Sequence, residues 1–203
     1  MGDSSSLSIS KVVGKIENHK KIIGIDPGTN ILGYSIVKVA NKKCILESAG
    51  IVNLQKFEDP YTKLKIIYER LSSIIISYAP DEMAVESPFY GKNIQSMLKL
   101  GRAQGVVIAC AMMHDVPVTE YYPKKIKQSI TGNGNASKEQ VAAMLKQLLS
   151  MDTLPKYLDA TDALGAAICH HLNTSRGNYS KNNSEKFGSW DQFLKANPNR
   201  IKK

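Results

Sequence analysis

The sequence has little cysteine, no long apolar run and no recognisable leader. Its three cysteines, Cys44, Cys110 and Cys169, are far apart and include no CxxC pair. This argues against a disulfide framework or a zinc site and favours reduced thiols. No apolar stretch approaches the length needed to span a bilayer, and MGDSSSLSIS lacks the basic start and apolar core of a secretory signal. These absences predict a cytoplasmic globular protein.

Acidic residues are also scarce relative to basic ones, at 18 against 27, so the net charge is +9. The excess is unevenly distributed. Residues 1–20 contribute +1, residues 92–138 contribute +5 and residues 175–203 contribute +5, which leaves the rest of the chain slightly acidic. A basic surface beside an acidic centre suggests a polyanion that is handled through metal ions. An ordinary solvated surface fits the charge count equally well.

The composition divides the chain into three parts. Residues 1–20 are Ser-rich and polar, which predicts a flexible N-terminal extension. Residues 21–174 carry the periodic apolar patterns of one folded domain. Residues 175–203 are rich in Asn, Ser and Lys, which predicts a basic, disordered C-terminal tail.

The apolar periodicity predicts an α/β domain. Strands are expected at 21–26, 31–39 and 44–54, as an antiparallel meander, and again at 82–87 and 116–121. Apolar residues spaced by three and four predict one helix that ends before Pro80 and two others over 93–114 and 159–172. Ser137 with Gln140 predicts a capping box at the start of a further helix. The order β-β-β-α-β-α-β-α-α predicts a mixed five-stranded sheet, three antiparallel strands and then parallel ones, flanked by helices. This is the order of the ribonuclease H-like fold.

Four carboxylates occupy element boundaries. Asp26 and Glu86 end the first and fourth strands, so parallel pairing of these strands would place both side chains about 5 Å apart at one edge of the sheet. Asp159 and Asp162 are three apart on one face of a helix. Such a set could hold two divalent cations, and Mg²⁺ prefers oxygen ligands.

Each carboxylate alone has an ordinary explanation. Asp-Pro-Gly is common turn chemistry, so Asp26 could simply start a turn. Asp159 could be an N-cap, Asp162 could offset the helix dipole, and Glu86 could be a surface residue. It is their conjunction at boundaries of the expected elements that favours a metal site.

Four sequence blocks resemble the RuvC family of Holliday junction resolvases across residues 21–172. They are IIGIDPGTNILGYSIV, VESPFYGKNIQSMLKLGRAQGVV, YYPKKIKQSITGNGNASKEQV and LDATDALGAAICH. The resemblance implies that Asp26, Glu86, Asp159 and Asp162 are catalytic ligands of two Mg²⁺ ions, for which Mn²⁺ can substitute. It implies that Phe89 stacks on a base at the opened crossover and that Lys127 and Lys138 lie near the scissile phosphate and the DNA backbone. Lys92, Lys124 and Lys125, in the basic window 92–138, are expected to add further DNA contacts. The chain departs from the family pattern at Ser87-Pro88, next to Phe89.

The resemblance also implies an activity and partners. The activity is symmetric, metal-dependent hydrolysis of a four-way DNA junction, which leaves 5′-phosphate and 3′-hydroxyl ends. Two symmetric cuts need a homodimer, and the helix over 93–114, flat at Gly101 and Gly105, is the expected contact. The family further implies RuvA and RuvB as partners.

Three other functions remain open on the residues. Another ribonuclease H-like nuclease would share the first aspartate and the fold, but would not be expected to carry the Phe89, Lys127 and Lys138 pattern. A junction-binding protein without catalysis would tolerate a broken acidic set, whereas all four positions here are acidic. A sugar kinase or actin-like ATPase would share a phosphate loop resembling DPGTNILGY, but those chains are longer and repeat the domain.

Overall fold

A five-stranded mixed sheet forms the centre of the molecule. The computed structural model describes residues 19–41, 43–87 and 93–183, with side chains described as far as residue 175. The strands are β1 (Lys20–Asp26), β2 (Ile31–Ala40), β3 (Lys43–Asn53), β4 (Glu82–Glu86) and β5 (Val118–Tyr121), in the spatial order β3-β2-β1-β4-β5. The β1–β2 and β2–β3 pairs are antiparallel, whereas β4 pairs in parallel with β1 and β5. The predicted meander and the predicted parallel pairing are both confirmed.

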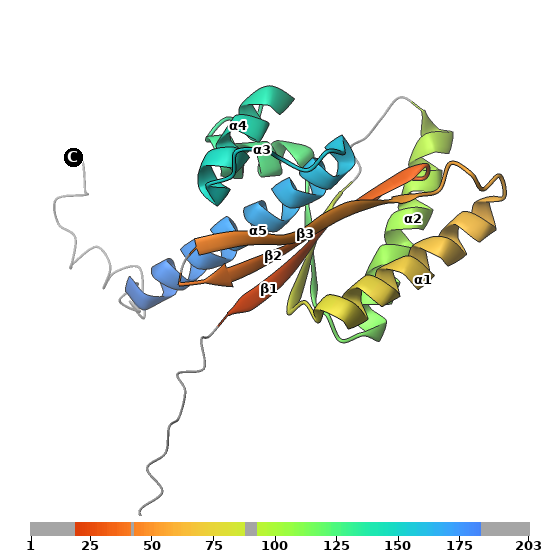
Figure 1. Cartoon of the computed structure of the whole chain (residues 1–203), viewed down its shortest axis with the longest axis horizontal. Helices are drawn as coiled ribbons and strands as arrows, with labels where there is room; N and C mark the ends of the chain where they lie inside the picture. The colour runs from red at the N-terminus through yellow and green to blue at the C-terminus, as the bar shows by residue number, and fades with distance from the viewer. Residues whose placement is uncertain (1–18, 42, 88–92, 184–203) are drawn as a thin grey trace, which may run out of the picture.

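Helices cover both faces of this sheet (Figure 1). The pair α1 (Pro60–Tyr78) and α2 (Ile94–Met113) packs on one face, and α3 (Pro123–Thr131), α4 (Lys138–Leu149) and α5 (Leu158–Asn183) pack on the other. A hydrophobic core lies on each face of the sheet, and residues of β1 contribute to both. Ile23 and Ile25 pack in the core under α1 and α2, and Ile22 packs in the core under α5. A strand that is buried on both faces has a continuous run of apolar residues in its sequence, as in KIIGID. No helix in the described ranges is both long and apolar enough to cross a membrane.

Local signals in the sequence explain where the helices begin and end. Asp59 accepts a hydrogen bond from the Thr62 backbone N–H at the start of α1, and Ala79 ends that helix in the left-handed conformation, directly before Pro80. Ser137 and Gln140 form both hydrogen bonds of a capping box at the start of α4. The expected capping box of α4 and the expected end of α1 before Pro80 are therefore confirmed, and Asp59 is a further cap that the sequence reasoning did not name. Such caps satisfy backbone groups that a helix end leaves free.

Two helix predictions were wrong. The sequence pattern gave no helix between β5 and the Gly132–Gly134 loop, yet α3 forms there, with Pro123 in its first turn, Ile126 and Ile130 buried, and Gly132 as its C-cap. The last helix was expected to end at Leu172 but continues to Asn183. The apolar pattern stops at Leu172, but residues 173–183 contain no proline. Gly177 within them weakens a helix by only about 1 kcal/mol, so the helix can continue. Of the tail expected to be disordered, residues 175–203, the segment up to Asn183 is therefore helical, and residues 184–203 lie outside the described residues.

Helix α5 lies unusually close to the first two strands. A Cβ atom on Gly24 of β1 would stand 2.0 Å from the carbonyl oxygen of Ala163, and one on Gly33 of β2 would stand 2.0 Å from that of Asp159. Real Cβ atoms do not approach a backbone oxygen this closely, so glycine at both positions allows the helix backbone to rest directly on the strands. This contact places the first turns of α5 over the carboxyl end of β1.

We expect Gly24→Ala to lower the free energy of unfolding by about 2 kcal/mol or more, because its Cβ would force α5 away from β1. Urea unfolding monitored by circular dichroism measures the change. The matched control is Ser35→Ala in the neighbouring register position. The Ser35 hydroxyl is buried without a hydrogen-bond partner among the described residues, so its removal should be neutral or slightly stabilising. Equal destabilisation by the two variants would contradict the importance of the close approach.

Candidate active site

Asp26 and Glu86 lie side by side at the carboxyl edge of the sheet. They are the last residues of β1 and β4, and the parallel register pairs Ile25 with Val85 immediately before them. Both residues are partly buried. Neighbouring parallel strands end at the same edge, which is the usual position of a functional site in such sheets.

The first turns of α5 bring two further carboxylates to this edge. Asp159 and Asp162 are partly buried and lie one helical turn apart. The carbonyl group of Asp159 lies against Gly33, the residue that pairs with Asp26 across the β1–β2 ladder. The position of both aspartates therefore depends on the close packing of α5 on β2.

The electrostatics show that these side chains act on one another. Burial, followed by repulsion from Asp162 and Asp159, raises the pKa of Asp26 to about 7. Burial, followed by repulsion from Asp26 and Asp162, raises the pKa of Glu86 to about 8. Like charges held close together in a poorly hydrated place favour the neutral form of a carboxyl group. The structure thus gathers all four acidic residues that the sequence singled out.

Two lysines face the carboxylates from α3 and α4. The Nζ of Lys138 donates a hydrogen bond of 3.0 Å to Oδ2 of Asp162 and forms an ion pair with it, and this contact raises the lysine pKa. Lys127 also acts electrostatically on Glu86. Glu86, Asp162 and both lysines line one cavity of about 260 Å³, whose remaining wall includes Ile126 and Val141. The cavity therefore joins acidic and basic groups beside an apolar wall.

The other residues expected to bind DNA are placed differently. Lys124 and Lys125 are exposed on α3, and neither lines the cavity that holds the carboxylates. Phe89 and Lys92 lie outside the described residues. The structure therefore brings Lys127 and Lys138 to the acidic cluster and leaves Lys124 and Lys125 on the surrounding surface.

Sequence reasoning missed a polar contact network beside Glu86. The Ser87 hydroxyl donates a 3.0 Å hydrogen bond to Oε2 of Glu120, and the side-chain amide of Gln104 donates to the same oxygen. The Ser87 backbone N–H also bonds to the carbonyl oxygen of Tyr121 at 2.9 Å. These contacts fix the chain directly after Glu86. No local pattern connects residues 87, 104 and 120, so only the fold could reveal the network.

The donor set fits a hard divalent cation. Four carboxylates supply oxygen ligands. Their mutual repulsion, which adds to burial in raising two of the pKa values, is the repulsion that a cation would relieve. In the part of the chain that the structure describes, no three acidic, histidine or cysteine side chains already stand as a ready-made ligand group. The side chains would therefore have to adjust on binding, and Asp162 would have to exchange Lys138 for the ion.

The sheet order, the parallel β1–β4 pair and the carboxylates at its edge define the class of protein, a ribonuclease H-like fold with an acidic site. The sequence profile described as "RuvC: Crossover junction endodeoxyribonuclease RuvC" matches residues 22–170. The chain belongs to this RuvC family, as its sequence blocks predicted.

Individual relatives agree with this assignment. The crossover junction endodeoxyribonuclease RuvC of Christiangramia forsetii is 50% identical over 196 residues, which cover 97% of this chain and 100% of the relative. The Thermus thermophilus RuvC structure has a TM-score of 0.72 and 31% identity, and the alignment covers 77% of this chain and 96% of that one. The structure of T. thermophilus RuvC in complex with a Holliday junction substrate has a TM-score of 0.70 and 29% identity, with coverages of 78% and 96%.

We expect Asp26→Asn to stabilise the metal-free protein at pH 8 but not at pH 4. An unfolded aspartate titrates near pH ~4, whereas the pKa of Asp26 in the folded protein is about 7. Between these values the folded state keeps a proton that the unfolded state has lost, so the wild-type free energy of unfolding falls as the pH rises through this window. Asparagine does not titrate, so the variant avoids this fall in the free energy of unfolding, which amounts to roughly 2–4 kcal/mol.

Urea unfolding in EDTA at several pH values measures the difference between variant and wild type. Asp152→Asn, at an exposed acid that does not line the cavity of Glu86 and Asp162, is the control and should show no gain that grows with pH. A constant difference between Asp26→Asn and wild type from pH 4 to pH 8 would contradict the raised pKa.

Proposed function

We propose that this chain is a structure-specific endonuclease that resolves four-way DNA junctions by divalent-cation-dependent hydrolysis of phosphodiester bonds. One observation carries the proposal: carboxylates from β1, β4 and α5 meet beside Lys138 at one edge of the sheet, in a chain of the RuvC family. A related RuvC from T. thermophilus is known in complex with a Holliday junction substrate. The products expected are 5′-phosphate and 3′-hydroxyl ends.

The cation requirement follows from the donor set. Asp26, Glu86, Asp159 and Asp162 would hold two Mg²⁺ ions, for which Mn²⁺ could substitute. Bound there, the ions would stabilise both the attacking and the leaving oxygen of the phosphoryl displacement. The chain itself supplies Lys127 and Lys138, which face the same cavity and would hold the scissile phosphate. When the phosphate enters, Lys138 would turn from Asp162 to the DNA.

The wider DNA surface would surround this cavity. Lys124 and Lys125 are exposed on α3 and could neutralise phosphates away from the cut, as sequence-independent contacts do. Phe89 and Lys92 complete the proposed set: Phe89 would stack on an unpaired base, and stacking of this kind is worth about 1–3 kcal/mol.

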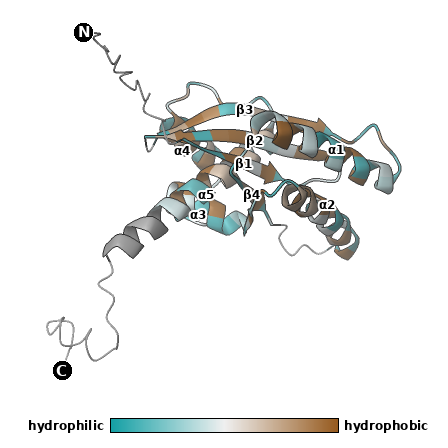
Figure 2. Ribbon diagram, turned by 90° about the horizontal axis from the view of Figure 1, so that it is seen from below, coloured by the Kyte–Doolittle hydropathy of each residue, from teal (hydrophilic) through white to brown (hydrophobic). Residues whose placement is uncertain are grey.

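Helix α2 provides the surface for a homodimer. Its inward side buries Ala103, Val107, Cys110 and Ala111, whereas Ile94, Leu98 and Met112 are 72%, 57% and 59% exposed. Figure 2 shows hydrophobic residues along this helix. Positions 101 and 105 are exposed glycines with no atom within 4 Å of a would-be Cβ, so a second helix could approach closely.

The exposed apolar face of α2 fits a second copy of the chain, since apolar faces of this kind mark interaction surfaces. A two-fold dimer would present two equal sites to the two-fold junction. RuvA and RuvB remain the proposed further partners, on family resemblance. The three free cysteines fit the proposed cytoplasmic location.

We expect Asp26→Asn, Glu86→Gln, Asp159→Asn and Asp162→Asn each to abolish cutting of a synthetic four-way junction in Mg²⁺, because each removes an ion ligand. Junction affinity should equal or exceed that of wild type, since the changes remove negative charge from a DNA-binding surface. Cutting is measured on labelled junctions in gels, and affinity in EDTA. Glu69→Gln, an exposed acid on α1, should cut normally. Wild-type rates in any of the four variants would exclude that residue from the site.

Leu98→Glu should convert the dimer to a monomer, because it places a charge in the proposed α2 contact. Paired cutting of the junction should be lost with the dimer. Sedimentation velocity measures the oligomeric state. Ile76→Glu changes a comparably exposed residue on α1 and should leave the dimer intact. A Leu98→Glu protein that remained dimeric would rule out this face.

A further inference from the structure

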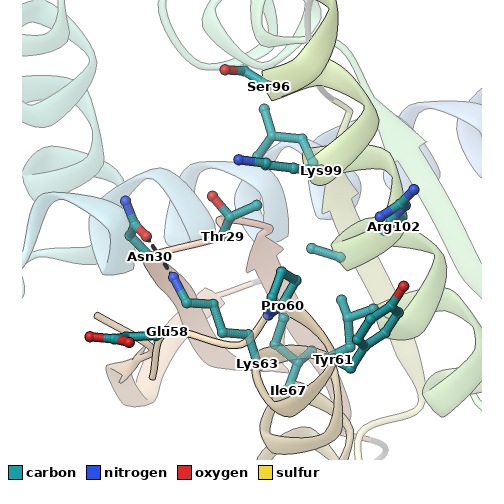
Figure 3. A pocket seen from close by; sticks show the side chains of 13 residues that line it. Thr29, Asn30, Glu58, Pro60, Tyr61, Lys63, Ile67, Ser96, Lys99 and Arg102 are labelled. Atoms are coloured by element: carbon teal, nitrogen blue, oxygen red, sulfur yellow. Dashed lines mark hydrogen bonds between the residues drawn. The ribbon is translucent and has the colours of Figure 1, made fainter. Parts of the chain in front are cut away.

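A second cavity, of about 370 Å³, lies between the N-terminal halves of α1 and α2. Its floor includes Thr29 and Asn30, in the turn between β1 and β2 (Figure 3). These residues follow Asp26 by three and four positions, so the chain alone keeps Thr29 within about 11 Å of the catalytic aspartate. Thr29 thus brings one wall of the cavity near the acidic site, although none of the four carboxylates lines the cavity.

Positive charge is concentrated in this cavity. It is lined by Lys63 of α1 and by Lys99 and Arg102 of α2, with Glu58 as its one acidic lining residue. Among the described residues none of the three cations forms an ion pair. The first turn of α2 has no acidic residue either, and Asn93 caps it without a charge. The positive end of that helix dipole therefore adds to the field of the side chains.

The positions of the side chains indicate what they would bind. Lys63 donates a 3.0 Å hydrogen bond to the side-chain oxygen of Asn30, which directs its ammonium group toward the floor. In Figure 3, Lys63 lies below Thr29, Lys99 above it and Arg102 to its right, so the three cations approach from different sides. Cations that are spread across two helices suit the successive phosphates of a strand better than the clustered phosphates of a free nucleotide.

An aromatic side chain completes the cavity. Tyr61, in the first turn of α1, lines it while remaining 73% exposed. An exposed ring beside cations is the combination that holds single-stranded nucleic acid, in which the ring stacks on a base and the cations hold the backbone. The hydroxyl groups of Thr29 and Ser96 add hydrogen-bond donors on the same walls.

We infer that the cavity between α1 and α2 binds an unpaired nucleotide of the DNA strand that enters the acidic site, with phosphates held by Lys63 and Lys99 and the base stacked on Tyr61. The inference deepens the proposed function and rests on it for the identity of the strand. It assigns to α1 a part in substrate binding.

The test compares two double variants that lose the same charge. Lys63→Gln with Lys99→Gln removes the cavity lysines, whereas Lys65→Gln with Lys146→Gln removes exposed lysines of α1 and α4 that do not line it. Affinity for a labelled single-stranded octanucleotide is measured in EDTA across a salt series. Two lost phosphate contacts should make the slope of log affinity against log salt shallower by about 1.4 in the cavity variant, and the control should retain the wild-type slope.

A second pair of variants tests the stacking. Tyr61→Ala should weaken octanucleotide binding by at least about fivefold, while Tyr61→Phe, which keeps the ring, should bind like wild type. Unchanged affinity and slope in the lysine double variant, or equal weakening by both Tyr61 variants, would overturn the inference.

Thymidine monophosphate supplies the third arm. If it bound as tightly as the octanucleotide, and lost affinity in the cavity variant while the octanucleotide did not, the cavity would be a free-nucleotide site and the inference would be wrong.

A failure of the proposed junction-cutting activity can be told apart from a failure of the proposed nucleotide site. A wild-type protein that bound the octanucleotide as expected but did not cut junctions would overturn the proposed activity and leave the nucleotide site standing.

Discussion

The structure depends on the contact between the backbone of α5 and the glycines of β1 and β2. Gly24 and Gly33 remove the side chains that would otherwise hold the helix away from the sheet. Two of the four carboxylates belong to the strands and two to the helix, so the distance between helix and sheet sets the distance between the halves of the site. A larger helix–sheet separation would move Asp159 and Asp162 away from Asp26 and weaken the repulsion that, after burial, raises the Asp26 pKa.

Gathering four carboxylates in a partly buried place works against stability. The raised pKa values of Asp26 and Glu86 show that the folded protein disfavours their charged forms. Lys138 relieves part of this repulsion through its contact with Asp162. The lysine proposed to bind a phosphate thus acts, in this structure, as the counter-ion of Asp162. Destabilising repulsion of this kind is typical of functional sites, where the residues needed for activity lower the stability of the folded state.

Much of this arrangement could be predicted from the sequence because its signals are local. The run KIIGID before Asp26 marks a buried strand, and the capping box at Ser137 marks a helix start. Parallel pairing of the first and fourth strands then places Asp26 beside Glu86. The helix α3 was missed because it is short and highly charged, although Pro123 and the spacing of Ile126 and Ile130 were usable signals.

The remaining features depend on contacts between distant parts of the chain. The bond of Ser87 to Glu120 joins residues 33 positions apart, and the cavity of Lys63 and Lys99 exists only because α1 and α2 lie side by side. Nothing in the sequence near Gly24 or Gly33 indicates that a helix beginning more than a hundred residues later would rest on them. Side-chain spacing predicts which residues share an element, but not which elements meet.

The position of α5 as the last element of the domain has a consequence for the synthesis of the protein. Domains emerge from the ribosome from the N-terminus onward, and the early segments can fold before the late ones appear. A nascent chain that has made the whole sheet still lacks Asp159 and Asp162. It therefore carries only half of the acidic cluster, and so does any fragment truncated before residue 158. If cutting needs all four carboxylates, as proposed above, interrupted translation would leave no partial product able to cut DNA.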